Sequence, residues 1–193
     1  LQHVSFYHPI LELYARSNLT FKRLNHRYRV GEITDHLVDI DIHVKQFRAQ
    51  IMRTRKKGGI SFETRHLIIK EIPLLPFNLL TVYNQQERSI LLPSSLTRLP
   101  VTFLYSQNNP VYVELLSSFL CSNLVEQQLT PHFPLLYGTA SVLFRSFTYL
   151  FKLSEDPYVC DRVNYRIYVK DNHKHVVTPK VPVQLLFQES IRF

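Results

Sequence analysis

Two residues of opposite charge, Lys70 and Glu114, are the first candidates for chemistry in this sequence. Lys70 follows the short apolar run Leu67–Ile69, which is typical of a strand, and Glu114 lies early in the helix that the sequence predicts next. A lysine on a strand can contact phosphate groups, but a lone ammonium in a cleft is costly to desolvate, so a carboxylate from the neighbouring helix would hold it. The pattern therefore indicates a phosphate-contacting ion pair between a strand and a helix.

Both residues also have a simpler explanation. Lys70 is followed by Glu71, and such neighbours at the end of a strand are often a solvent-facing charge pair. A glutamate near a helix N-terminus is favourable in any helix, because it complements the helix dipole. The two explanations stay open at the level of sequence.

Other signatures of catalysis or metal binding are missing from the sequence. It contains only 4 Gly and neither a GxGxxG nor a GxSxG motif. The adjacent Gly58 and Gly59 favour a hairpin turn, where a positive φ is needed. His173 and His175 are separated by one lysine on an expected hairpin tip, which favours an exposed loop over a metal site. The two cysteines are too few for a disulfide framework and indicate core thiols in a reducing compartment.

The elements that would position Lys70 and Glu114 follow from periodicity and turn signals. Asn109 followed by Pro110 is a strong helix start, with asparagine as N-cap and proline as the first helical residue. In chain order we expect a short helix at 9–17, β-like alternation over 34–52, a basic turn over 53–59, a strand over 66–72, a short strand at 101–105, a helix from 110 that ends before Pro131, a strand within 132–138, a polar turn at 154–157, a hairpin tip at 170–174 and a last strand at 183–187.

This order and several of its residues resemble the serine/threonine kinase-like proteins of nucleocytoplasmic large DNA viruses (iridoviruses and relatives). The most specific part is NPVYVELLSSFLCSNLVEQQLTPHFPLLYG, in which a helix bearing a glutamate leads into a TPHFPL-type sequence. LIIKEI is similar to the family's lysine-bearing strand, and LLFQES is similar to its hinge strand. The resemblance covers roughly residues 60–193.

The resemblance implies roles for five residues. Lys70 would contact the phosphates of ATP and Glu114 would be its helix partner, while Phe187 would lie near the gatekeeper position and Gln188 and Glu189 at the hinge. ATP and Mg²⁺ are the cofactors of an active kinase. The implied fold is α+β: a kinase-like small N-terminal lobe (N-lobe) of about five antiparallel strands and one main helix, with an N-terminal extension and insertions.

The sequence departs from an ordinary kinase in two ways. No glycine-rich loop precedes Lys70, and no HRD-like catalytic loop or DFG-like metal site occurs within the 193 residues. We therefore expect the catalytic base and the metal ligands in a second lobe beyond Phe193, so that this chain alone does not catalyse phosphoryl transfer. The expected domains are an extension at 1–33 and the N-lobe at 34–193, with insertions at 74–108 and 139–181.

Composition narrows the possible partners. The formal net charge is +8, which favours polyanionic partners, and the basic run Arg53–Lys57 is the expected phosphate contact if nucleic acid binds. That run has no interleaved aromatic residues, so base stacking is not expected there. No apolar stretch is long enough to span a bilayer, and no signal peptide is recognised.

Three functional hypotheses follow. The first is the N-lobe of a viral serine/threonine kinase-like protein that binds ATP for phosphoryl transfer to protein Ser or Thr. The second is a degenerate kinase-like scaffold that acts as a minor, capsid-associated virion protein. The third is a basic nucleic-acid-binding module. For the first two we expect protein partners and a location in the host cytoplasm or the virion.

Overall fold

A computed structural model describes residues 4–5, 28–55, 58–80, 102–106, 108–157 and 164–191. The expected helix at 9–17 lies outside these residues. The chain divides into two compact units. Unit 1 comprises Leu1–Tyr7, Pro73–Ser106 and Ser141–Val183, and unit 2 comprises His8–Ile72, Gln107–Ala140 and Gln184–Phe193.

The first described residues of unit 2 form three consecutive antiparallel strands. They are β2 (Tyr28–Asp41), β3 (Val44–Thr54) and β4 (Ile60–Pro73), of which β4 ends at the border with unit 1. The register pairs Thr54 with Ile60 at one end of the β3–β4 hairpin and Val44 with Lys70 at the other. The expected turn at the first end is present, with φ of 81° at Gly58 and 89° at Gly59.

The alternating stretch 34–52 belongs to two strands rather than one. It spans the end of β2 and most of β3, with a tight turn at residues 42–43 between them. The backbone N–H of Ile42 donates to Oδ1 of Asp41 at 2.6 Å, which helps to close this turn. Asp41 is a turn-forming residue type, but the stretch contains neither Gly nor Pro, so its alternation alone does not mark the break.

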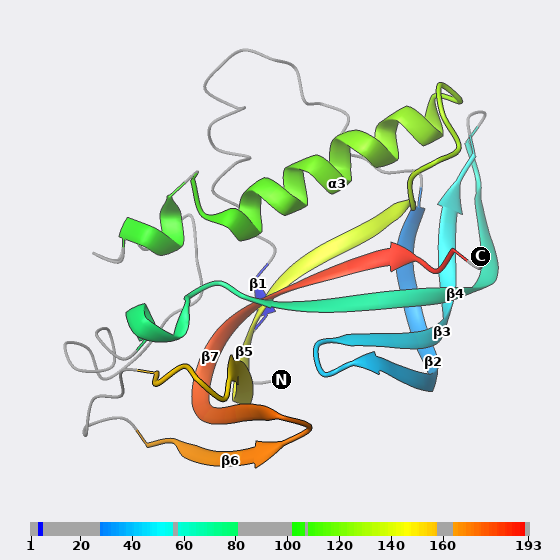
Figure 1. Cartoon of the computed structure of the whole chain (residues 1–193). Helices are drawn as coiled ribbons and strands as arrows, with labels where there is room; N and C mark the ends of the chain where they lie inside the picture. Colours follow the sequence, from blue (N-terminus) through cyan, green and yellow to red (C-terminus); the bar gives the residue numbers. More distant parts are fainter. Residues whose placement is uncertain are drawn as a thin grey trace. The chain divides into compact units, whose positions relative to one another are not determined.

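Helix α3 (Pro110–Glu126) packs on the sheet of unit 2 (Figure 1). In the strand order, β7 (His173–Glu189) lies between β4 and β5 (Leu136–Lys152), and the start of β5 and the end of β7 belong to unit 2. One apolar cluster joins helix and sheet; its members are Leu115, Phe119, Leu136, Leu186 and the partly buried Ile72. This cluster is the part of the core that fixes α3 over the Lys70-bearing strand.

The predicted helix start is confirmed. Oδ1 of Asn109 accepts a hydrogen bond from the backbone N–H of Val111 at 3.1 Å, and Pro110 is the first helical residue. The helix ends well before Pro131, at Glu126, and Gln128 takes a left-handed φ of 63° just beyond it.

Unit 1 contains the rest of β5 and β7 together with two short strands. Strand β1 (Val4–Ser5) pairs with β5, and β6 (Arg166–Lys170) pairs with β7. The turn between β6 and β7 has a positive φ at both Asp171 and Asn172, at the expected hairpin tip. The segments predicted as insertions, 74–108 and 139–181, fall almost wholly in this unit.

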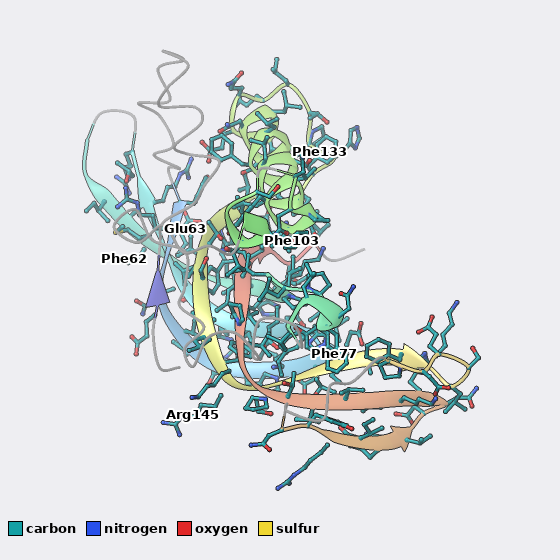
Figure 2. All side chains as sticks on the ribbon, turned by 90° about the vertical axis from the view of Figure 1, so that its left-hand side faces the viewer. Phe62, Glu63, Phe77, Phe103, Phe133 and Arg145 are labelled. Carbon is teal, nitrogen blue, oxygen red and sulfur yellow. The ribbon has the colours of Figure 1, made fainter. Side chains whose placement is uncertain are left out.

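The core of unit 1 is rich in aromatic side chains. Phe77, labelled in Figure 2, packs against Tyr149 and Phe151, and its ring centroid lies 5.4 and 5.5 Å from theirs. The hydroxyl of Tyr149 donates to the carbonyl oxygen of Leu75 at 2.8 Å, and burial raises the pKa of Tyr149 above its ordinary value. The 3₁₀ helix η1 (Thr102–Tyr105) contributes the fully buried Leu104.

The predicted α+β class with an antiparallel sheet is confirmed, with two differences in detail. Six strands follow the order β1-β5-β7-β4-β3-β2 and β6 pairs with β7, so the described sheet has more strands than the five or so expected. The strand expected at 101–105 is wrong, because Thr102–Tyr105 is the 3₁₀ helix η1. A four- or five-residue apolar run is too short for its period to separate the two conformations.

The N-cap of α3 gives a direct test of this fold. We expect Asn109→Ala to lower the free energy of unfolding by about 1–2 kcal/mol, measured by urea denaturation, because the amide of Val111 loses its acceptor. Asn109→Ser should retain most of the stability, since serine also accepts from the first turn. An equal loss in both variants would show that packing of the buried asparagine, rather than capping, matters.

Candidate functional site

Lys70 and Glu114 meet in the structure. Nζ of Lys70, on β4, lies 2.8 Å from Oε1 of Glu114, on α3, and both belong to unit 2. Lys70 shares a strand face with Ile72, which packs on α3, and Glu114 directly precedes the buried Leu115. Each charged side chain is 40% exposed, so the pair lies at the edge of the helix–sheet contact rather than in the core.

Glu71 does not pair with its neighbour Lys70 but contacts Lys45 and His43. Its side chain lies on the opposite face of β4, where Oε1 accepts from Nζ of Lys45 at 2.6 Å and Oε2 lies 3.8 Å from Nδ1 of His43. Burial opposes ionisation of Glu71, but the contacts with His43 and Lys45 outweigh it and hold the pKa below its ordinary value. The simple pairing of Lys70 with its sequence neighbour is therefore not what the structure contains.

The predicted gatekeeper residue Phe187 and the predicted hinge residues Gln188 and Glu189 divide between the two faces of β7. Gln188 is on the α3 face, where its Nε2 donates to Oγ of Ser118 at 3.2 Å. Glu189 points to the other face, where its Oε1 accepts from Nη1 of Arg65 at 3.1 Å. Phe187, which alternates with Gln188, is half-buried. The structure thus brings Lys70, Glu114 and Gln188 onto one face and leaves the side chains of Phe187 and Glu189 on the other.

Backbone groups at the predicted hinge are already engaged within unit 2. The N–H of Glu189 donates to the carbonyl oxygen of Leu135 at 2.8 Å, and the N–H of Ser190 donates to that of His66 at 3.2 Å. These two donors are therefore used by the sheet and by the segment before β5.

The glycine pair lies far from Lys70. In the β3–β4 register, Ile60 follows Gly59 directly, and Lys70 lies ten residues further along the same strand. At about 3.3 Å per residue this separation is roughly 33 Å. The turn beside Lys70 is instead the one between β2 and β3, which carries Asp41 and His43. Gly58 and Gly59 cannot cover a phosphate that Lys70 contacts.

Sequence reasoning missed a second charged cluster, centred on Arg65 of β4. Its guanidinium lies 2.6 Å from Oε2 of Glu63 and 3.4 Å from the hydroxyl oxygen of Tyr137, in addition to its contact with Glu189. Its carbon Cζ also lies 5.5 Å from the ring centroid of Tyr28. The only signal in the sequence was the i, i+2 spacing of Glu63 and Arg65, which is common on exposed strands.

The ionisation of this cluster follows from its contacts. Arg65 holds the pKa of Glu63 below its ordinary value through a hydrogen bond, and Arg53, 3.5 Å away, adds to the effect. Burial raises the pKa of Tyr137 to about 12. For Arg65, burial alone would lower the pKa, but the hydrogen bonds that it donates to Glu63 and Tyr137 outweigh this effect and raise the pKa. At neutral pH the carboxyl group of Glu63 and the guanidinium of Arg65 are therefore ionised, whereas the hydroxyl of Tyr137 keeps its proton.

Of the basic run Arg53–Lys57, which was expected to contact nucleic acid, Arg53 has partners within the protein. Arg53 pairs with Glu63 and lies 5.4 Å from the ring centroid of Tyr28, whereas Lys56 and Lys57 lie outside the described residues. Arg53 is thus engaged in the Arg65 cluster.

A cavity of about 610 Å³ lies in unit 2 beside this cluster. Its lining includes Arg65, His66, Val125, Phe133, Glu189 and Ile191. It therefore adjoins the predicted hinge segment but is about four strand residues, or roughly 13 Å, from Lys70.

The described residues contain no group of three or more His, Cys, Asp or Glu side chains that could hold a metal ion. Within the same ranges, no helix is long and apolar enough to cross a membrane. Cys121 is a half-buried free thiol on α3, and Cys160 lies outside the described residues.

Comparison with protein-family models, with curated proteins and with solved structures finds no match for this chain.

Because both side chains of the Lys70–Glu114 pair are 40% exposed, we expect the pair to contribute little to the free energy of unfolding. In a double-mutant cycle with Lys70→Met and Glu114→Gln, we expect a coupling free energy below about 1 kcal/mol by urea denaturation, since exposed ion pairs gain little in water. A coupling several times larger would show that the pair holds α3 on the sheet.

The lowered pKa values of Glu63 and Glu71 predict that the free energy of unfolding decreases at acid pH. A carboxyl group with a lowered folded-state pKa adds stability above its unfolded-state pKa, here the ordinary value of 4.5, and that stability is lost as the pH falls through the folded-state pKa. We expect Glu71→Gln to be less stable than the parent at pH near 7 and this gap to narrow below about pH 4.5. A gap independent of pH, in denaturation measured across this range, would contradict the assignment.

Proposed function

We propose that this chain is the nucleotide-binding N-lobe of a serine/threonine kinase-like protein. The observation that carries the proposal is the contact of 2.8 Å between Nζ of Lys70 and Oε1 of Glu114, across β4 and α3. The two residues were selected from sequence by the phosphate-contacting role, and they lie 44 positions apart in the chain. A strand lysine fixed by a helix carboxylate is the arrangement that this role requires.

The geometry suits contact with phosphate oxygens. A lysine ammonium has three N–H donors, and Glu114 takes one of them. The side chain of Lys70 remains 40% exposed, so phosphate oxygens can reach its other donors. Glu114 would then limit the motion of the ammonium, and the lysine would neutralise charge on the α- and β-phosphates of ATP.

The residues that would complete phosphoryl transfer are not among those that carry this site. Mg²⁺ would bridge the phosphates, and a catalytic base would accept the proton of the substrate hydroxyl. No HRD-like or DFG-like motif occurs in the sequence to supply these groups. The activity that we propose for this chain is therefore nucleotide binding, with transfer to protein Ser or Thr dependent on a second lobe.

Two observations favour a second candidate, a degenerate kinase-like scaffold that serves as a capsid-associated virion protein. The glycine pair is at the far end of the β3–β4 hairpin from Lys70, and the backbone N–H groups of Glu189 and Ser190 already have acceptors. In a scaffold, the Lys70–Glu114 pair would only orient α3, and protein partners would replace the nucleotide.

A thermal-shift titration with ATP and Mg²⁺ separates the two candidates. If ATP binds, a concentration about tenfold above Kd stabilises the protein by about 1.4 kcal/mol, or roughly 3–6 °C in Tm. Lys70→Met should abolish the shift because the phosphates lose their cation. The matched control is Lys152→Met, which removes an exposed lysine of β5.

Either of two results would contradict nucleotide binding at this site. The absence of a shift at millimolar ATP and Mg²⁺ would favour the scaffold. An equal shift in the parent and in Lys70→Met would place the nucleotide elsewhere.

A further inference from the structure

We propose that unit 1 binds single-stranded nucleic acid on one face of the β6–β7 hairpin, with a base stacked on Tyr168 and phosphates held by Arg166 and Lys170. This site is separate from the Lys70–Glu114 pair, which belongs to unit 2.

The register of the hairpin gathers cationic and aromatic residues on one face. Strand β6 pairs with β7 so that Arg166 lies opposite Val177, Tyr168 opposite His175, and Lys170 opposite His173. Directly opposed residues of an antiparallel pair, and every second residue along each strand, point to the same side. We call this set the hairpin face; it consists of Arg166, Tyr168, Lys170, His173, His175 and Val177.

An aromatic platform lies at the centre of the hairpin face. The rings of Tyr168 and His175 are stacked, with centroids 4.8 Å apart and planes at 17°. His175 is only 8% exposed, and its Nε2 lies 3.2 Å from the carbonyl oxygen of Lys170. Tyr168 is 45% exposed, so a base can stack on it while His175 supports the ring from beneath. The platform is therefore held in place before any ligand arrives.

Two accessible cations flank the platform. Arg166 and Lys170 each lie two residues from Tyr168, or roughly 6.6 Å along the strand. Arg166 is exposed and forms no ion pair with the part of the chain that the structure describes. The carboxylate of Asp171 is 3.9 Å from Nζ of Lys170, but the two side chains are 80% and 67% exposed, so this contact competes weakly with a phosphate. Lys174 points to the other side of β7 and pairs with Asp156.

A cavity of about 620 Å³ continues the hairpin face. It is lined by Ser146, Asn164, Tyr165, Arg166, Val177 and Pro179, of which Arg166 and Val177 also belong to the face. Its volume is within the range of small-molecule sites, and a nucleotide unit fits this class. Tyr165 offers a second, partly exposed ring, while Asn164 and Ser146 offer hydrogen-bonding groups.

These features favour a single strand over other polyanions. A basic surface with interleaved aromatic rings is the way proteins bind unpaired bases, whose faces are accessible for stacking. In a duplex those faces are covered by neighbouring bases, and an anionic membrane or an acidic peptide would use Arg166 and Lys170 but gain little from Tyr168. Basic side chains on a sheet edge also hinder aggregation, yet edge protection does not call for an aromatic platform and an adjoining cavity.

The test uses fluorescence anisotropy of labelled single-stranded oligothymidine and oligouridine with the whole chain. We expect Tyr168→Ser to weaken binding by about tenfold and Tyr168→Phe to retain it, because stacking needs the ring and not the hydroxyl. Arg166→Gln should weaken binding and reduce the slope of log K against log salt by about 0.7. The matched control, Arg145→Gln, removes an exposed arginine of β5 and should bind as the parent does (Figure 2).

Three outcomes would overturn the proposal. They are no binding of either oligonucleotide, equal binding of the parent and Tyr168→Ser, and binding of heparin or phosphatidylserine vesicles at equal strength. If Tyr168→Ser lowers Tm, the double variant Arg166→Gln with Lys170→Gln leaves the ring pair intact; unweakened binding in that variant would also refute the site.

Discussion

The apolar contact between α3 and the sheet of unit 2 decides where Glu114 can reach. Leu115, Phe119, Leu136 and Leu186 are each at least nine-tenths buried, and burying one such side chain is worth about 1.5–3 kcal/mol. The side chains of Lys70 and Glu114 are each 40% exposed, and an exposed ion pair contributes less than about 1 kcal/mol to the free energy of unfolding. Packing therefore positions the ion pair, rather than the reverse. This leaves the lysine's charge available for a ligand.

The side chains on the two faces of β4 make different kinds of contact, and the same is true at the end of β7. On β4, the α3 face carries Ile72 with Lys70 at the edge. The other face carries the Arg65 cluster and the Glu71–Lys45 pair on either side of the buried Leu67 and Ile69. Glu189, whose neighbour Gln188 faces α3, is committed to Arg65 on this second face. The glutamate at the predicted hinge thus pairs with Arg65 on β4, a contact that the order of residues in the sequence does not reveal.

The sequence correctly predicted those features that depend on only a few neighbouring residues. The N-cap Asn109, the glycine turn at 58–59 and the hairpin tip at 171–172 each depend on a few neighbouring residues, and each is found where expected. The last strand was recognised at 183–187 but extends from 173 to 189. Residues 181–186 are buried on both faces and read as a nearly continuous apolar run, whereas His173–Lys180 mixes polar and charged residues with apolar ones and is only partly buried. The Arg65 cluster unites residues from five strands, so no local pattern could predict it.

The two proposed sites would bind phosphate groups by different physical means. Lys70 has one carboxylate partner and a fixed position beside packed apolar residues, which suits a ligand of defined geometry such as a nucleoside triphosphate. Arg166 and Lys170 are exposed and weakly paired, which suits a chain of repeating phosphates whose position along the surface varies. In the second site the ring of Tyr168, and not the charge, supplies the fixed point. The residues of the two proposed sites belong to different compact units, so a substitution in one site does not alter the residues of the other.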